Sequence, residues 1–158
     1  MERPFPAYQG DAAYIFVSYA HADAEAVYPE LIRLREQGFN IWYDEGISPG
    51  SSWREELATA INDCALFLMF ITPRSVKSEP CQKEVNFAES HNCRILAVHL
   101  EETELPMGLE LVLGDRQAIL RYQHPTSAYH DKLFDSLAMH VESGKAETSS
   151  TVAVLARS

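Results

Sequence analysis

The sequence lacks any long hydrophobic run. Its longest apolar stretch, residues 65–71, holds seven residues, whereas an α-helix needs about 20 to cross a bilayer. Residues 1–11 are polar and contain prolines, without the basic and then apolar layout of a signal peptide. We therefore expect no membrane-spanning segment and no export.

Cysteine is also scarce. The three cysteines, Cys64, Cys81 and Cys93, are odd in number and form no Cys-x-x-Cys pair, the spacing that marks redox and zinc motifs. His91 and Cys93 are close in the sequence, but one such pair before a strand seldom forms a metal site. The cysteines favour a reducing, cytoplasmic compartment, and we expect no metal.

Basic residues are outnumbered. The chain has 13 Lys and Arg against 23 Asp and Glu, a net charge of −10. A charge of this sign repels phosphate backbones and anionic lipids, and no basic run offsets it. We expect no direct binding of nucleic acid and no binding to membranes.

Three common signatures are missing as well. The sequence contains no Gly-x-Gly-x-x-Gly, no Gly-x-x-x-x-Gly-Lys-Ser/Thr and no Gly-x-Ser-x-Gly. Their absence excludes an ordinary dehydrogenase, a P-loop nucleotidase and a serine hydrolase built on a nucleophile elbow.

What is present suffices for one core. A chain of 158 residues, 46% of them hydrophobic, fits a single domain. The composition suggests an N-terminal arm at 1–11 and a domain at 12–142. Gly, Ser, Thr and Ala dominate residues 143–158, which we interpret as a flexible tail or a linker to a further domain.

Strand and helix patterns alternate along that domain. Short β-branched and aromatic runs predict strands at 14–18, 39–43, 65–71 and 94–100, and a short fifth strand at 117–121. Apolar residues at helical spacing predict helices at 23–38, 52–64, 78–91 and 126–141. The stretch 101–115 is left unassigned. This alternation predicts an open parallel α/β sheet, whose ligands bind at the carboxyl ends of the strands.

Local signals set several helix ends. Asp23 is expected to cap the first helix and Gly38 to end it. Pro29 should bend that helix or delay its start. Ser52 and Glu55 have the spacing of a capping box at the start of the second helix.

Four segments carry a family resemblance. They are residues 16–23 (FVSYAHAD), 42–53 (WYDEGISPGSSW), 71–75 (ITPRS) and 78–84 (SEPCQKE). In order and spacing they resemble the Toll/interleukin-1 receptor (TIR) domain family, especially its bacterial NAD-cleaving branch, over about residues 12–141. The resemblance implies a flavodoxin-like five-stranded parallel sheet with helices on both faces. It also implies one of two functions, cleavage of NAD⁺ or non-catalytic assembly.

Glu84 distinguishes these two functions. Its spacing from Cys81 and Ala88 puts it on a face with small, semi-apolar residues, although a glutamate near a helix start can also serve the helix dipole alone. The resemblance implies a catalytic role for Glu84. Nicotinamide is a good leaving group, so one carboxylate that stabilises an oxocarbenium-like transition state is sufficient, without metal or cofactor. Whether Glu84 acts as a nucleophile or electrostatically is left open.

The resemblance also implies contacts to the substrate NAD⁺, from Ser18, Tyr19, Asp44, Trp53, Ser78 and Cys81. Alternatives stand beside three of them. Ser18 can be a turn hydroxyl, Asp44 a turn carboxylate and Trp53 a core residue. The chain departs from its relatives at Ala20 and His21, where NAD-cleaving animal members often carry arginines, and at Pro80, where many carry tryptophan.

The residues after Asp44 resemble the family's BB loop, which contacts neighbouring TIR domains. Its candidate assembly residues are Gly46, Ile47, Ser48, Pro49 and Gly50. The resemblance implies that activity depends on association with other TIR domains, as a homo-oligomer or filament. An acidic monomer opposes that association, so a silent monomer gathered by a C-terminal sensor domain is expected.

The sequence thus predicts an assembly-dependent NAD⁺ glycohydrolase that releases nicotinamide and ADP-ribose or a cyclic form. Its place would be the effector part of a bacterial anti-phage or immune signalling protein. The alternative is a non-catalytic TIR module that signals by homotypic assembly. A receiver domain is a poorer option, because the first strand ends without the clustered aspartates such a domain needs.

Overall fold

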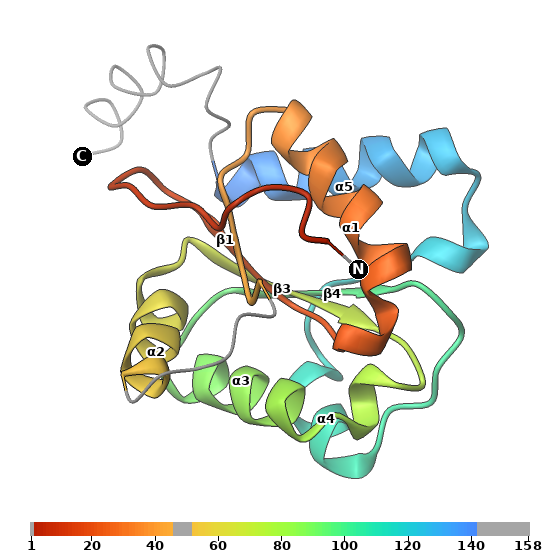
Figure 1. Cartoon of the computed structure of the whole chain (residues 1–158). Coiled ribbons are helices and arrows are strands. Elements are labelled where there is room, and N and C mark those ends of the chain that lie inside the picture. The colour runs from red at the N-terminus through yellow and green to blue at the C-terminus, as the bar shows by residue number, and fades with distance from the viewer. Residues whose placement is uncertain (1, 46–51, 142–158) are drawn as a thin grey trace.

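The computed structural model describes residues 2–45 and 52–141 (Figure 1). Five parallel strands form one sheet in the order β2-β1-β3-β4-β5. Their bounds are Ile15–Ser18 for β1, Ile41–Tyr43 for β2, Leu66–Ile71 for β3, Ile95–His99 for β4 and Ala118–Leu120 for β5. The predicted flavodoxin-like fold is confirmed, including the short fifth strand.

Helices cover both faces of the sheet. They are α1 (Ala24–Glu36), α2 (Trp53–Asp63), α3 (Glu79–Ser90), α4 (Met107–Leu113) and α5 (Thr126–His140). Figure 1 shows α1 and α5 on one face and α2, α3 and α4 on the other. A parallel sheet covered on both sides needs strands that are apolar throughout, and β3 is buried at every position.

The core is built on β1 and β3, which lie side by side in the sheet. Phe16 stacks on Phe67 with ring centroids 5.2 Å apart and on Trp42 with centroids 5.0 Å apart. These rings are all buried. Stacked rings of this kind add to the stabilisation that burial of their area provides.

Both ends of α1 lie where the sequence predicts them, after Asp23 and before Gly38. Gly38 has φ 96°, and its amide donates to the Arg35 carbonyl at 2.9 Å, as a C′ glycine does. Pro29 lies inside α1 without delaying its start. The carbonyl that its missing N–H would have bonded belongs to Glu25, an exposed residue, so the lost bond is on a side of the helix that solvent can reach.

The two predicted side-chain caps are wrong. Asp23 and Ser52 precede α1 and α2 but make no capping hydrogen bond, so the Ser52–Glu55 capping box does not form. Their backbones, at φ −97°, ψ 10° and φ −94°, ψ 2°, are outside the extended region from which a cap side chain reaches the first turn. Within the unassigned stretch 101–115 the structure places α4.

Residues 5–8 run beside β2, the edge strand. The Tyr8 amide donates to the Ile41 carbonyl at 2.9 Å, and the Tyr43 hydroxyl donates to the Phe5 carbonyl. Phe5 and Ala7 are buried there. The segment covers a sheet edge that would otherwise present unpaired backbone groups.

Candidate active site at the carboxyl ends of β1 and β2

A pocket of about 210 Å³ opens at the carboxyl ends of β1 and β2, beside the first turns of α3. Its lining comprises Phe16, Val17, Tyr19, His21, Asp44, Ser78, Pro80 and Glu84. Four of these, Tyr19, Asp44, Ser78 and Glu84, are candidate site residues that the sequence singled out from separate segments. The parallel topology brings them together, because β1 and β2 are neighbours whose carboxyl ends meet at one edge.

Glu84 is the carboxylate of this pocket. The Ser18 hydroxyl donates to its Oε1 at 2.8 Å, and Ser18 is itself a buried residue at the end of β1. Burial raises the pKa of Glu84 from 4.5 to about 7, with Asp44 adding to the rise and the Ser18 hydrogen bond and His21 opposing it. The structure therefore holds a carboxyl group that titrates near neutrality, a property common at functional sites.

Glu84 is not in the first turn of α3, where the helix dipole acts most strongly. Glu79 is the acidic residue in the first turn of α3, whereas Glu84 lies in the second turn. Cys81 and Ala88 are buried on the face that Glu84 shares, as their spacing predicts.

Tyr19 and His21 connect the pocket to the chain after β2. The Tyr19 hydroxyl donates to the Asp44 carbonyl at 2.7 Å, and burial raises its pKa. His21 Nε2 lies 3.3 Å from Asp44 Oδ2, and this contact raises the pKa of the imidazole. The sequence had marked His21 only as a departure from its relatives; its pairing with Asp44 depends on the adjacency of β1 and β2, which no local pattern reveals.

Ser78 lines the α3 side of the pocket, whereas Cys81 is not among the lining residues. Ser78 is the N-cap of α3, and its Oγ accepts from the Cys81 amide at 3.3 Å. Cys81 is 1% exposed and lies behind the pocket wall; burial raises the pKa of its thiol. Pro80 is exposed and lines the pocket. Many relatives carry a tryptophan at this position, which would form a larger wall.

Trp53 lies outside this pocket. It stacks on Trp42 with centroids 6.0 Å apart and is half-buried against the core. It also faces a second cavity, a groove of about 570 Å³ between α2 and α3 that Glu84 and Pro80 line as well. Glu84 thus borders both cavities, the polar pocket and the more apolar groove.

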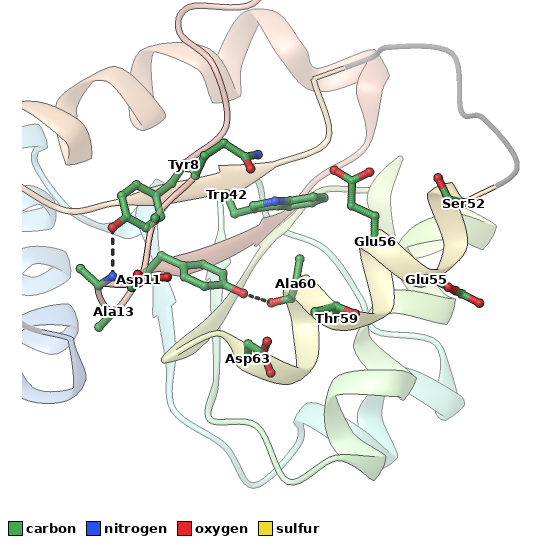
Figure 2. Close-up of a pocket in the computed structure, with 14 residues that line it drawn as sticks. Tyr8, Asp11, Ala13, Trp42, Ser52, Glu55, Glu56, Thr59, Ala60 and Asp63 are labelled. Carbon is green, nitrogen blue, oxygen red and sulfur yellow. Dashed lines mark hydrogen bonds between the residues drawn. The ribbon is translucent and has the colours of Figure 1, made fainter.

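A third cavity, of about 650 Å³, lies between the N-terminal segment and α2 (Figure 2). Its charged lining residues are all acidic: Asp11, Glu55, Glu56 and Asp63. Tyr14 closes its floor by donating to the Ala60 carbonyl at 2.6 Å. Glu84 is absent from it, so this cavity is no part of the candidate site despite its size.

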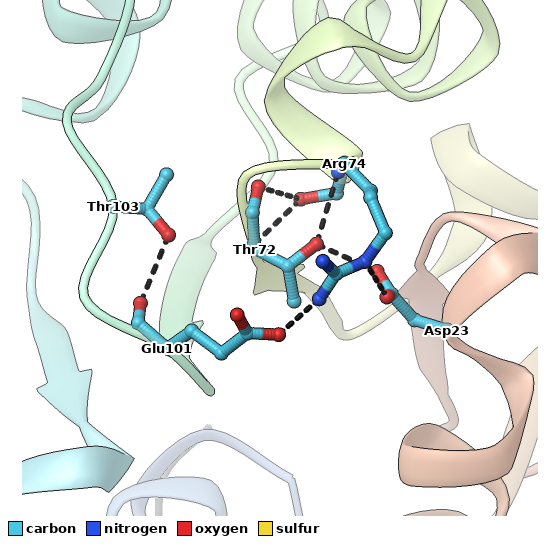
Figure 3. Close-up of polar contacts among 6 residues, drawn as sticks. Asp23, Thr72, Arg74, Glu101 and Thr103 are labelled. Carbon is cyan, nitrogen blue, oxygen red and sulfur yellow. Dashed lines mark hydrogen bonds and ion pairs between the residues drawn. The ribbon is translucent and has the colours of Figure 1, made fainter.

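The carboxyl ends of β3 and β4 are occupied by a polar network around Arg74 (Figure 3). Arg74 forms ion pairs with Asp23 and Glu101, and the Thr72 hydroxyl donates to Asp23 Oδ2 at 2.6 Å. These four residues, which we call the Arg74 network, tie α1 to the ends of two strands. The β1–β2 end of the edge is thereby left as the place for a ligand.

The predicted assembly residues Gly46, Ile47, Ser48, Pro49 and Gly50 lie outside the described residues. Glu45, just before them, accepts a hydrogen bond from the Ala7 amide at 2.5 Å and pairs with Arg3, so it holds the N-terminal segment against the end of β2. Over residues 2–45 and 52–141, no group of three His, Cys, Asp or Glu side chains is placed to hold a metal ion. No helix in these ranges is both long and apolar enough to cross a membrane.

Fold and pocket together define an open parallel α/β protein with a half-buried carboxylate at the carboxyl ends of its strands. The sequence of residues 15–138 matches the family model described as TIR domain. The chain therefore belongs to the TIR domain family.

Solved structures agree on the fold. The TIR domain of the Toll-related receptor TRR-2 from Hydra magnipapillata matches with a TM-score of 0.63 and 19% identity, over 78% of this chain and 96% of that one. The TIR domains of the activated Roq1 resistosome, which recognises the pathogen effector XopQ, match with a TM-score of 0.65 and 14% identity, over 80% and 99%.

A third structure, the CMP N-glycosidase BcmB of Clostridium botulinum, matches with a TM-score of 0.53 and 18% identity, over 76% and 97%. A search of the curated proteins finds no match to the sequence. At these identities the likenesses concern the fold.

Proposed function

We propose that this TIR domain is an NAD⁺ glycohydrolase of the bacterial NAD-cleaving branch. The observation that carries the proposal is Glu84, a half-buried carboxylate that accepts a hydrogen bond from Ser18 and lines the pocket at the carboxyl ends of β1 and β2. NAD⁺ is the substrate, and the products are nicotinamide and ADP-ribose or a cyclic form of it.

The reaction breaks the bond between the ribose C1′ and the nicotinamide nitrogen. The bonding electrons leave with nicotinamide, which becomes neutral, and positive charge develops at C1′. Glu84 stabilises that charge or bonds to C1′ transiently. Water then adds at C1′ and loses a proton, which completes hydrolysis; attack by an adenine nitrogen of the same molecule gives the cyclic product.

The environment of Glu84 suits this role. A pKa of about 7 leaves part of the population protonated at neutral pH, and the cationic nicotinamide ring favours the ionised form when it binds. Ser18 orients the carboxylate through one hydrogen bond. His21, paired with Asp44, lies on the same pocket and opposes the rise in the pKa of Glu84.

The fold neighbours are consistent with this chemistry. BcmB is named as an N-glycosidase of CMP, so the same fold supports cleavage of a bond between a sugar and a nitrogen base. Function lies in the site and not in the fold, and for this reason the proposal depends on Glu84.

Assembly is the second part of the proposal. Self-association into a homo-oligomer or filament switches the activity on, and residues 46–50 take part through contacts with a neighbouring TIR domain. The net charge of −10 opposes association of free monomers, and the Roq1 neighbour is named as a resistosome. We place the domain in the cytoplasm, as the effector of a bacterial anti-phage or immune signalling protein whose C-terminal sensor domain gathers the subunits.

The test measures, by chromatography, how fast concentrated or crowded protein releases nicotinamide from NAD⁺. Glu84→Gln keeps the shape of the side chain and the Ser18 contact, and it should lower the rate by about 10³-fold, the loss typical when one electrostatic group of a transition state is removed. Glu110→Gln, the same change on an exposed face of α4, is the matched control and should keep full activity. Undiminished turnover by folded Glu84→Gln would overturn the assignment.

A second candidate function is a non-catalytic assembly module. The observation that favours it is Pro80, an exposed small residue at the pocket wall. In that case, wild-type protein that self-associates under crowding releases no nicotinamide.

A further inference from the structure

We infer that the groove between α2 and α3 binds the adenylate half of the dinucleotide, with Phe87 and Leu57 against the base and Arg54 and Lys83 against the phosphates. The inference rests on the proposed function for the identity of its ligand. It extends that function by assigning the part of the substrate distant from the bond that breaks.

The groove is apolar along its length. Ile61 is buried at one end, and Leu57 and Phe87 are half-buried along its walls. The α2 residues that line it run from Trp53 to Ile61, about 12 Å of helix at 1.5 Å per residue. Phe87 already stacks on His91 with centroids 4.0 Å apart, so its ring is held in place and offers the groove an aromatic surface for a planar base.

Two cations border this apolar surface. Arg54 comes from α2 and Lys83 from α3, and both line the groove and are exposed. Lys83 lies 3.0 Å from Glu79 in a solvent-exposed pair, an interaction weak enough to be exchanged for a phosphate. Arg54 makes no ion pair with the residues that the structure describes. Glu79 and Glu84 line the groove as well, so its charges balance, whereas the whole chain carries a net charge of −10. The exposed Arg54 and Lys83 are the groove residues that can contact an anionic group.

Continuity with the pocket selects this ligand. Glu84 and Pro80 line the groove as well as the pocket at the ends of β1 and β2. A dinucleotide whose ribose C1′ lies at Glu84 therefore has its other half directed either to solvent or into this groove. The chain carries Ala20 and His21 where NAD-cleaving animal relatives often have arginines, so Arg54 and Lys83 of the groove are the cations available to the phosphates.

The first experiment measures binding without turnover. 5′-AMP and ribose 5-phosphate are titrated separately into the whole chain, and the indole N–H signal of Trp53 is followed by NMR; Trp53→Phe identifies that signal. We expect 5′-AMP to shift it saturably and ribose 5-phosphate, which has no base, to leave it unchanged. Equal shifts by both compounds, or none by 5′-AMP, would overturn the inference.

Variants then test the groove itself. Arg54→Ala combined with Lys83→Ala should weaken 5′-AMP binding about fivefold, the effect of losing exposed charge contacts. Lys132→Ala on α5 is the matched control for charge. Ala58→Phe fills the groove without removing a contact atom and should abolish binding. Unchanged affinity in the double variant and in Ala58→Phe contradicts the proposed site.

Turnover separates this inference from the proposed function. The Arg54 and Lys83 double variant should raise the KM for NAD⁺ and leave both kcat and the cleavage of nicotinamide mononucleotide, which lacks the adenylate half, unchanged. Binding of 5′-AMP without any nicotinamide release would sink the proposed function and keep the adenylate site. Nicotinamide release with the same KM for NAD⁺ in the double variant and in the wild type would keep the proposed function and overturn the adenylate site. A Trp53 shift that depends on protein concentration alone would identify a second copy of the chain as the occupant and overturn the inference.

Discussion

Two carboxylates lie at the carboxyl edge of the sheet, and their surroundings are opposite. Asp23 is 6% exposed and forms an ion pair with Arg74, and it accepts a hydrogen bond from Thr72. Glu84 has a hydrogen bond from Ser18, and burial raises its pKa to about 7. One end of the edge has its charges paired, whereas the other keeps a carboxyl group without a cation in direct contact among the described side chains.

The difference separates a carboxylate with a structural role from the one that we propose to be catalytic. A buried charge is stabilised when an opposite charge and further hydrogen bonds accompany it, as at Asp23. A buried carboxyl group that lacks them costs folding free energy and keeps its capacity to interact with a ligand. Pairing is therefore more informative here than cavity size, since the acidic cavity of Figure 2 is about 650 Å³ and the Glu84 pocket about 210 Å³.

The largest expected effect is on stability at the Arg74 network. Asp23→Ala should lower the free energy of unfolding by about 2–3 kcal/mol, because it leaves the Thr72 hydroxyl without its acceptor and removes the buried partner of Arg74. The value is below that of a fully buried pair because Arg74 is 45% exposed. Glu101→Ala, which removes the half-exposed partner of the same arginine, should cost less than about 0.5 kcal/mol. Urea denaturation of both variants measures the contrast, and equal losses would contradict the distinction.

The sequence predicts the features of this edge that depend on local patterns, and it does not predict those that depend on tertiary contacts. The strands, Gly38 and the position of Glu84 follow from local patterns and from the rule that parallel strands align their ends. The side-chain role of Asp23 does not, because its partners Thr72 and Arg74 are about 50 residues away in the chain and compete with the capping role that its local sequence suggests. The His21–Asp44 pair and α4 were missed for the same reason, since tertiary contacts decide them.

A second, smaller effect concerns Glu84 and stability. Its pKa is about 7 in the folded protein against 4.5 without burial. Between these values the folded state retains a proton that the unfolded state releases, so the contribution of this carboxyl to stability is lost as pH rises from about 4.5 to 7. Glu84→Gln, which has no such proton to lose, should be more stable than wild type by about 1–2 kcal/mol at pH 8 and by less than about 0.5 kcal/mol at pH 5.

Thermal or urea unfolding of Glu84→Gln and wild type at the two pH values measures this difference in stability. Asp23→Asn, the corresponding change in a paired carboxylate, serves as the comparison and should destabilise the protein at pH 8. A Glu84→Gln variant that is less stable than wild type at pH 8 would show that Glu84 is structural, like Asp23.

The pH dependence of nicotinamide release follows from the same pKa. Because Glu84 must be ionised to stabilise positive charge at C1′, kcat/KM should rise with pH and level off above about 7. One pH unit below the pKa, at about pH 6, the rate should be about tenfold lower than on the plateau. Assembly has to be measured in parallel, by light scattering at each pH, so that loss of self-association is not mistaken for protonation. A flat profile between pH 5.5 and about 8 would contradict catalysis by the ionised carboxylate.

The smallest expected effect tests whether His21 and Asp44 influence Glu84 across the pocket. His21 lowers the pKa of Glu84, while Asp44 raises it. His21→Gln removes the imidazole, which pairs with Asp44 at 3.3 Å, and leaves the Asp44 charge less compensated. Both consequences raise the pKa of Glu84, so the midpoint of the kcat/KM profile should move to higher pH by a few tenths of a unit, with the plateau retained. His124→Gln, the same substitution after β5 and outside the pocket lining, should leave the midpoint in place. A midpoint that moves to lower pH in His21→Gln would mean that the imidazole does not act on Glu84 as a positive charge, and it would confine the electrostatics of the pocket to Glu84 and Asp44.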